Sequence, residues 1–173
     1  KNSFALYPSG STLARISFCY EALDYFENAL YNINEAISLD TSDYIYLFRK
    51  ANILNELGRK EEAIANIDKY MLENPNYGSY YKRGWFKDHG GNVDGAIDDY
   101  TMSIGLNPGF IHSYLSRGIL WYIKGDKENA QNDFKHIIDL DSVPNDNSCA
   151  QYAYFYMGDN EKAIDFLNRI LEK

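Results

Sequence analysis

The chain has 173 residues, of which 45% are apolar, and it carries a formal net charge of −8 with a pI near 4.8. This is enough chain for one packed domain or one array of repeats, and no stretch approaches the roughly 18–20 apolar residues of a membrane span. The lack of such a stretch predicts no membrane insertion. Because an acidic chain is repelled by phosphate groups, we expect no nucleic-acid partner.

Two cysteines, Cys19 and Cys149, are the only thiols of the sequence. The repeat register described below places them about four units apart, which is too far for a disulfide within one array. Two unpaired thiols favour a reducing compartment such as the cytoplasm. The chain begins at Lys1 without an initiator Met, which leaves open a removed signal peptide.

Residues 1–9 precede the periodic part of the chain, and we expect this N-terminal segment to cover the apolar edge of the first helix pair. From residue 10 onward, apolar residues recur at helical spacing and are interrupted by glycine and proline. Residues 10–173 are therefore predicted to form a single array of helix pairs. Its five units lie near residues 10–43, 44–76, 77–110, 111–143 and 144–173.

The third and fourth units carry the clearest repeat. Moving the sequence forward by 34 residues places the pair Arg83-Gly84 on Arg117-Gly118. Four further matches are Gly91 on Gly125, Ala96 on Ala130, Asp99 on Asp133 and Ile104 on Ile138. Self-similarity at this period is typical of stacked helical hairpins.

Two kinds of position recur for physical reasons. An alanine early in each second helix faces a small residue of the first helix, which lets two backbones approach closely. The helices then meet at a hinge where a left-handed residue ends the first and an N-cap begins the second. The alanines are Ala29, Ala63, Ala96, Ala130 and Ala163, facing Ser17, Ala51, Gly84 and Gly118 in the first four units; the hinges are Asp24, Gly58, Gly91, Gly125 and Gly158, with Asn92, Asp126 and Asp159 as candidate caps.

These residues resemble the tetratricopeptide repeat (TPR) pattern over about 95% of the chain. The third unit supplies Tyr80, Gly84, Gly91, Ala96, Tyr100, Ser103 and Pro108, and the fourth supplies Tyr114, Gly118, Trp121, Gly125, Ala130 and Phe134. The resemblance implies an all-α, right-handed superhelical solenoid whose first helices line a concave groove. The fifth unit departs from the pattern at Gln151, where a small residue is expected, so a slip of one residue in its first helix stays open.

Arginine replaces the usual leucine of the pattern at Arg83 and Arg117, and an aspartate follows each of them by 16 residues, at Asp99 and Asp133. The other units have neither residue at these positions. We therefore predict two ion pairs that brace the helices of one unit, Arg83 with Asp99 and Arg117 with Asp133.

The inward positions implied by the resemblance form a candidate peptide-binding groove, aromatic with scattered acids. Its predicted lining is Phe18, Phe48, Asn52, Tyr81, Trp85, Asp88, His89, Leu115, Ile119 and Tyr122, extended by Glu21, Asn55, Tyr152 and Phe155. Such a groove would take a basic or neutral peptide. The alternative is that several of these rings pack against the next hairpin. The cationic set with which some TPR modules grip a C-terminal carboxylate is incomplete.

No catalytic, metal or cofactor site is expected. Asp88-His89 is the only adjacent acid and imidazole, and neighbouring residues of a helix diverge by about 100°. The three histidines lack metal-ligand spacing. The sequence thus favours a non-enzymatic scaffold or adaptor that binds another protein. The alternative function is self-association, for example as a homodimer, through the last helix face at Ile164, Leu167 and Leu171.

Overall fold

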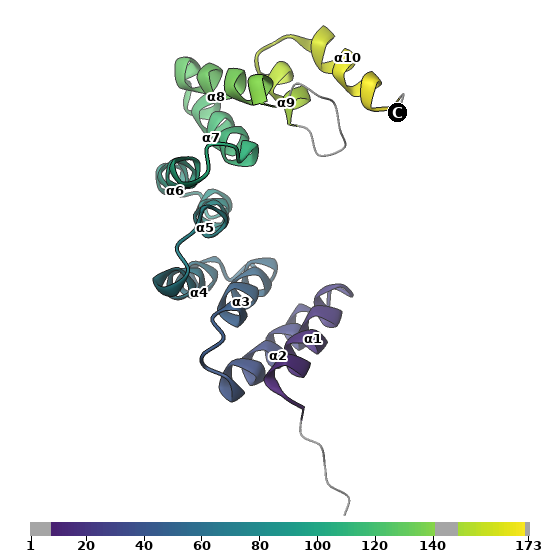
Figure 1. Ribbon diagram of the computed structural model, residues 1–173, viewed down its shortest axis with the longest axis vertical. Helices are drawn as coiled ribbons and strands as arrows, with labels where there is room; N and C mark the ends of the chain where they lie inside the picture. Colours follow the sequence, from purple (N-terminus) through teal and green to yellow (C-terminus); the bar gives the residue numbers. More distant parts are fainter. Residues whose placement is uncertain (1–7, 141–148, 172–173) are drawn as a thin grey trace, which may run out of the picture. The chain divides into compact units, whose positions relative to one another are not determined.

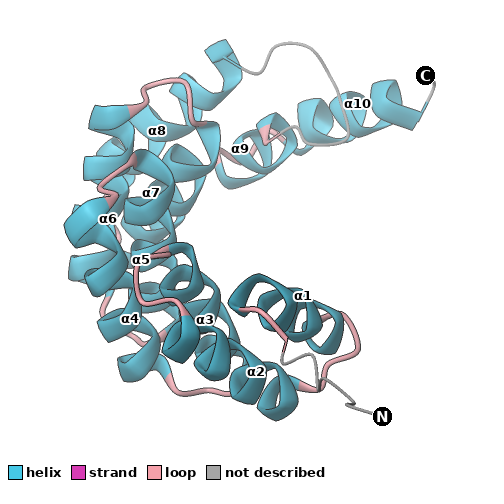
Figure 2. Cartoon of the chain, turned by 60° about the horizontal axis from the view of Figure 1, so that its bottom comes forward, coloured by secondary structure: helices cyan, strands magenta, loops and turns pink. Residues whose placement is uncertain are grey.

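A computed structural model describes residues 8–140 and 149–171, and these residues form ten α-helices and no strand (Figures 1 and 2). Consecutive helices pack as antiparallel hairpins, which confirms the predicted all-α fold of five helix-turn-helix units. The five hairpins are α1 (Gly10–Glu21) with α2 (Phe26–Leu39), α3 (Ile45–Glu56) with α4 (Lys60–Glu73), α5 (Tyr77–His89) with α6 (Val93–Leu106), α7 (Ile111–Lys124) with α8 (Lys127–Leu140), and α9 (Ala150–Tyr156) with α10 (Asn160–Leu171).

Contacts divide the chain into two compact units, Lys1–Pro75 and Asn76–Lys173. The first holds two hairpins and the second holds three, and each is described by itself below. A single uninterrupted array stays a prediction. Within the described ranges, no helix has the length and apolarity needed to cross a membrane. The N-terminal segment that was expected to cover α1 falls almost entirely outside the described residues.

The hinges between paired helices are built as predicted. Gly58, Gly91, Gly125 and Gly158 have φ between +75° and +84°, the left-handed region in which a glycine meets no Cβ penalty. Asp24 holds the same conformation with φ of 60°, as the one described residue other than glycine with positive φ. The hinge therefore fixes the backbone of every hairpin, including the one that lacks glycine.

A side-chain cap follows three of the hinges. Backbone N–H groups donate to a side-chain oxygen of Asn92 at 3.0 Å, of Asp126 at 3.2 Å and of Asp159 at 3.2 Å. Each bond satisfies a donor that the first turn of a helix leaves unpaired. Hydrogen bonds from the side chain and then the backbone of Asn129 lower the pKa of the Asp126 carboxyl. One short connection thus ends a helix and begins the next.

The contact between paired helices is as close as the small residues allow. The hydroxyl of Ser17 donates to the carbonyl of Ala29 at 2.9 Å. A Cβ built on Gly84 would lie 2.9 Å from Cε1 of Tyr100, and one on Gly118 would lie 2.8 Å from Cε1 of Phe134. All five repeated alanines are buried: Ala29, Ala63, Ala96, Ala130 and Ala163.

Neighbouring hairpins in the second unit share both apolar and polar contacts. Leu120 of α7 is buried with Ala96, Ile97 and Tyr100 of α6. The hydroxyls of Ser103 and Ser113 lie 2.7 Å apart in the same interface. The stacking of α7 on α6 is therefore a continuation of the hydrophobic core.

The fifth hairpin is the irregular one. Its first helix has only seven residues, and it follows the segment 141–148, which lies outside the described residues. Counted back from the hinge Gly158, the small-residue position falls on Gln151, which is half-buried, whereas its neighbour Ala150 is buried. The departure noticed in the sequence thus corresponds to a local change in which side chain enters the core.

Candidate functional site

The inward positions differ in how far their side chains are already used by the fold. Ten residues before the hinge, the Phe48 ring packs 5.3 Å from Tyr70, and the Tyr81 ring lies 5.7 Å from Tyr100 and 5.1 Å from Phe110. Leu115 and Ile119 pack against a buried cluster of α7, α8 and α9: Tyr114, Ala130, Phe134, Ile137, Cys149 and Ala153. Four of the ten predicted lining residues thus contribute to the core, as the alternative reading proposed.

The unit Lys1–Pro75 carries one exposed aromatic ring on α1 and two neighbouring asparagines on α3. Phe18 on α1 is 59% exposed, and the Arg49 guanidinium lies 5.2 Å from its ring centroid. Arg49 also pairs with Glu21 at 3.3 Å, so the predicted acid Glu21 is already engaged. The side-chain oxygens of Asn52 and Asn55 are buried, and they accept no hydrogen bond from the described part of the chain. Since the two residues are three apart on α3, they lie on one helix face.

On α5, the predicted residues Trp85, Asp88 and His89 lie together near the C-terminus of the helix. The ring of His89 lies 4.0 Å from that of Trp85, and its Nδ1 is 2.9 Å from the Trp85 carbonyl. The ammonium of Lys82 lies 4.6 Å from the Trp85 ring centroid. Trp85 and Asp88 are half-buried and His89 is exposed. These contacts hold the indole in one orientation at the surface.

Beside this cluster, Tyr100 is fully buried. Burial chiefly, and then the negative charge of Asp88, raise the pKa of the Tyr100 phenol, while the Ser116 hydroxyl lowers it. The phenol therefore remains protonated over the physiological pH range. Asp88 therefore lies close enough to Tyr100 for its negative charge to act on the phenol.

On α7 and α9 the exposed rings come three and six residues before the hinges. Tyr122 is 47% exposed and lies 5.4 Å from Tyr156. Tyr152 and Phe155 are 51% and 60% exposed. Exposed rings that a partner could contact thus lie three and six residues before a hinge, whereas the rings ten residues before a hinge are packed in the core.

Both predicted Arg–Asp pairs are present as two-bond contacts. Arg83 Nε and Nη2 donate to the two oxygens of Asp99 at 2.9 and 2.6 Å, and Arg117 makes the same contacts to Asp133 at 3.0 and 2.7 Å. The ammonium of Lys87 also forms an ion pair with Asp99, at 2.8 Å. Both aspartates are buried. A fork of this kind compensates a carboxylate removed from water.

The second pair also reaches beyond its own hairpin. Nη1 of Arg117 donates to Thr101 Oγ1 on α6 at 2.9 Å. Burial raises the pKa of the Asp133 carboxyl, and the hydrogen bond and charge of Arg117 oppose that shift. Both arginines thus donate to groups of the fold.

The tetratricopeptide repeat family model matches residues 44–77 and residues 152–173. These matches cover the second hairpin and most of the fifth. The chain carries tetratricopeptide repeats. The sequence of the TPR repeat-containing protein MJ1428 of Methanocaldococcus jannaschii is 28% identical over 141 residues, covering 80% of this chain and 24% of that protein. The human DnaJ homolog subfamily C member 3 is 26% identical over 181 residues, covering 94% and 35%.

The chain spans about a quarter to a third of these relatives. Solved structures of the same fold include TTC0263 of Thermus thermophilus, with a TM-score of 0.70, 20% identity and coverage of 95% of this chain and 91% of that one. The MamA protein matches with a TM-score of 0.69, 17% identity and coverage of 94% and 90%. YrrB, a TPR protein with an unusual peptide-binding site, matches with a TM-score of 0.64, 18% identity and coverage of 91% of this chain and 82% of that one.

One contact of this TPR chain escaped the sequence reading. Cys149 Sγ lies 3.5 Å from His112 Nδ1, although the residues are 37 positions apart. Cys149 is buried, so a substrate does not reach its sulfur, and the pair serves packing. Among the described residues, no group of three or more His, Cys, Asp and Glu side chains is placed to hold a metal ion.

Proposed function

We propose that the chain binds an extended segment of a partner protein along the inward face of its first helices. The observation that carries this proposal is the pair of buried side-chain oxygens on Asn52 and Asn55, which accept no hydrogen bond within the described chain. A buried acceptor without a donor costs free energy, about 1–3 kcal/mol in proteins. A peptide backbone supplies N–H donors, and the two oxygens, which are covered in the free chain, would reach them by rotation of the amide side chains.

Aromatic side chains on the same helix positions would add affinity. Phe18 presents an exposed ring on α1, and Trp85 presents an oriented indole on α5. Large rings that are already fixed lose little entropy on binding and commonly dominate interfaces. We therefore assign affinity to the ring that each unit presents, and the backbone register on Lys1–Pro75 to the two asparagines.

Charge favours a partner segment that is neutral or basic. Glu21 is paired with Arg49, which leaves Asp88 as the acid of the predicted lining. With a net charge of −8, the chain repels acidic segments at long range. The peptide-binding site of YrrB, a protein of the same fold, supports this role by analogy.

The test is a fluorescence-polarisation screen with labelled ten-residue peptides in basic, neutral and acidic sets. We expect basic and neutral sequences to be selected. For a selected peptide, Asn52→Ala with Asn55→Ala should weaken binding about tenfold, and Trp85→Ala should weaken it by a similar factor, since each removes about 1–2 kcal/mol.

The matched control is Tyr31→Ala, which removes an equally large ring from a 65% exposed position on the second helix α2. This variant should bind as the parent does. Equal binding by the parent and both groove variants would overturn the proposal, and so would selection of acidic peptides alone.

A further inference from the structure

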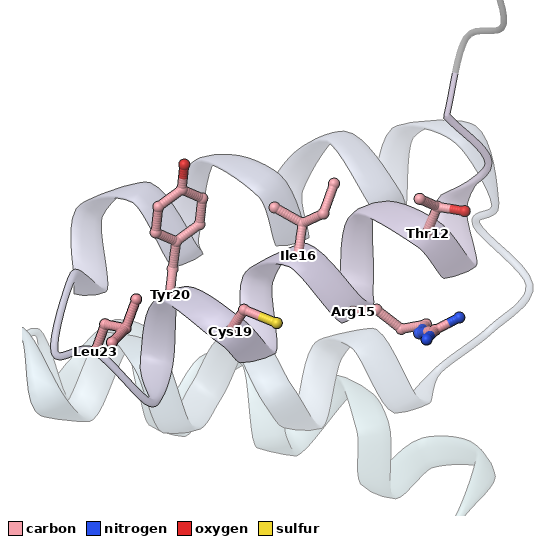
Figure 3. Close-up of a pocket in the computed structure, with 6 residues that line it drawn as sticks. All are labelled: Thr12, Arg15, Ile16, Cys19, Tyr20 and Leu23. Carbon is pink, nitrogen blue, oxygen red and sulfur yellow. The ribbon is translucent and has the colours of Figure 1, made fainter.

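The two end hairpins carry open apolar faces that correspond to the two sides of an internal interface. On α1 and the turn that follows it, a pocket of 470 Å³ is lined by one row of side chains (Figure 3). On the last hairpin, a pocket of 690 Å³ lies between α9 and α10. We call them the head face and the tail face. The head face comprises Thr12, Arg15, Ile16, Cys19, Tyr20 and Leu23; the tail face is defined by Gln151, Tyr152, Phe155, Tyr156, Asn160, Ala163, Ile164 and Leu167.

Counted from the hinges, the head face is the set of positions with which α7 contacts α6. Ile16, Cys19 and Tyr20 correspond to Arg117, Leu120 and Trp121. In α7, Arg117 bonds Thr101, and Leu120 and Trp121 enter the cluster of α6. The ends of the row match as well. Thr12 corresponds to Ser113, which contacts Ser103, and Leu23 corresponds to Lys124, which contacts Asp94.

The tail face is the opposite side of the same interface. Ala163, Ile164 and Leu167 correspond to Ala96, Ile97 and Tyr100, which receive Leu120 and Trp121. The exposed fractions show that this face is uncovered among the described residues. Ile97 is 5% exposed and Tyr100 0%, whereas Ile164 is 59% exposed and Leu167 is 44% exposed.

The contact between Arg49 of α3 and Phe18 of α1 also has corresponding residues on the two end faces. Arg49, nine residues before its hinge, lies over the ring of Phe18, which is six residues before the preceding hinge. Arg15 holds the Arg49 position on the head face, and Tyr152 holds the Phe18 position on the tail face. An arginine above an aromatic ring is a favourable contact at an exposed site.

We propose that the partner of each face is a second copy of this chain, with the head face of one copy stacked on the tail face of the next. The contact repeats the register of α7 on α6, with Cys19 and Tyr20 against Ala163 and Ile164. Because the two faces differ, the interface is heterologous, and each bound copy leaves one face of each kind open. Assembly therefore extends with concentration and does not stop at a symmetric dimer.

Cysteine cross-linking tests the register directly. In the proposed contact Cys19 lies against residue 164, as Leu120 lies against Ile97. Oxidation of Ile164→Cys should give a ladder of dimers, trimers and longer species on a non-reducing gel, since each copy then has a head thiol and a tail thiol. Adding Cys19→Ser should abolish the ladder. Leu72→Cys, at an 80% exposed position of α4, controls for random collisions.

A mixing experiment tests the polarity. Cys19→Glu should disable the head face and Ile164→Glu the tail face. Both positions are exposed, so we expect circular dichroism to show unchanged helical content. In sedimentation velocity, each variant alone should self-associate more than about tenfold more weakly than the parent. An equimolar mixture should form dimers and nothing longer, because one intact head meets one intact tail.

Three outcomes would overturn the proposal. A parent that stays monomeric at all concentrations is one. A dimer of Ile164→Cys that persists in the Cys19→Ser background would mean pairing of two tail faces. Slow maleimide labelling of Cys19 even in dilute protein would mean that another part of the same chain covers the head face. Labelling that slows as concentration rises is the expected result.

Discussion

The hairpins α5–α6 and α7–α8 make the helix contact differently from α1–α2 and α3–α4. Nine residues after the hinge, the first pair places a ring and the second pair an isoleucine. The facing residue is glycine against each ring, and serine or alanine against each isoleucine. The closeness of two helices is therefore set by the summed volume of both residues. The pairs are Gly84 with Tyr100, Gly118 with Phe134, Ser17 with Ile33 and Ala51 with Ile67.

The same two pairs of hairpins also differ in whether they bury a charged residue. Where α6 and α8 bury an aspartate under an arginine, α2 and α4 have Asn32 and Asn66, which donate to carbonyls of their own helices at 2.8 Å. Opposite them stand Ile16 and Lys50, and burial lowers the pKa of the Lys50 ammonium. A carboxylate is thus buried here only together with a guanidinium that reaches it from the facing helix.

The largest effect is expected from removing one partner of a braced pair. Arg117→Met leaves the buried Asp133 without its guanidinium and should lower the free energy of unfolding by about 3–5 kcal/mol. Arg83→Met should cost less, because Lys87 still lies 2.8 Å from Asp99. Urea denaturation followed by circular dichroism measures both values.

Exchanging both partners sharpens this comparison. Arg117→Ile with Asp133→Asn installs the residues of the first hairpin and should recover most of the loss, because no buried charge remains. If the double variant is as unstable as Arg117→Met, the pair is not what distinguishes the two kinds of hairpin.

A middle-sized effect is expected from the ring-packed contact. Gly118→Ala places a methyl group 2.8 Å from the Phe134 ring, and such overpacking should cost about 1–3 kcal/mol in thermal or urea unfolding. Adding Phe134→Ile reproduces the Ala51–Ile67 contact of α3–α4. A double-mutant cycle should then show positive coupling between the sites. Strictly additive changes would argue against matched volumes.

The smallest effect concerns the hinge. Asp24 has φ of 60°, whereas the other four hinges are glycines. Asp24→Gly should raise the stability of the chain by about 0.5–1 kcal/mol, since it removes the Cβ penalty of the left-handed region. The mirror change Gly91→Asp should lower stability by a similar amount. Unchanged stability in both variants would mean that the Asp24 conformation carries no strain, and differential scanning calorimetry resolves shifts of this size.

Internal repetition explains why so much of the fold was predictable. The hinges, the alanine contacts and the Arg83–Asp99 geometry each depend on positions at fixed spacing within one unit. The roles of Phe48 and Tyr81 were not predictable in the same way, because their packing depends on rings from other helices, such as Tyr70 and Phe110. The unpaired oxygens of Asn52 and Asn55 and the Cys149–His112 contact likewise follow from neighbours that the spacing does not specify.

The bond from Arg117 to Thr101 has a consequence for how the second unit comes apart. One guanidinium joins α6, α7 and α8, and the Ser103–Ser113 contact ties α6 to α7 from another side. Opening α7–α8 alone would strand these donors, so α5 to α8 should exchange their slowest amide hydrogens as one cooperative block. Repeat arrays often lose their units one by one from the ends. In this chain, fraying from the C-terminal end should stop at α8, because the Arg117 bonds join that helix to α6 and α7.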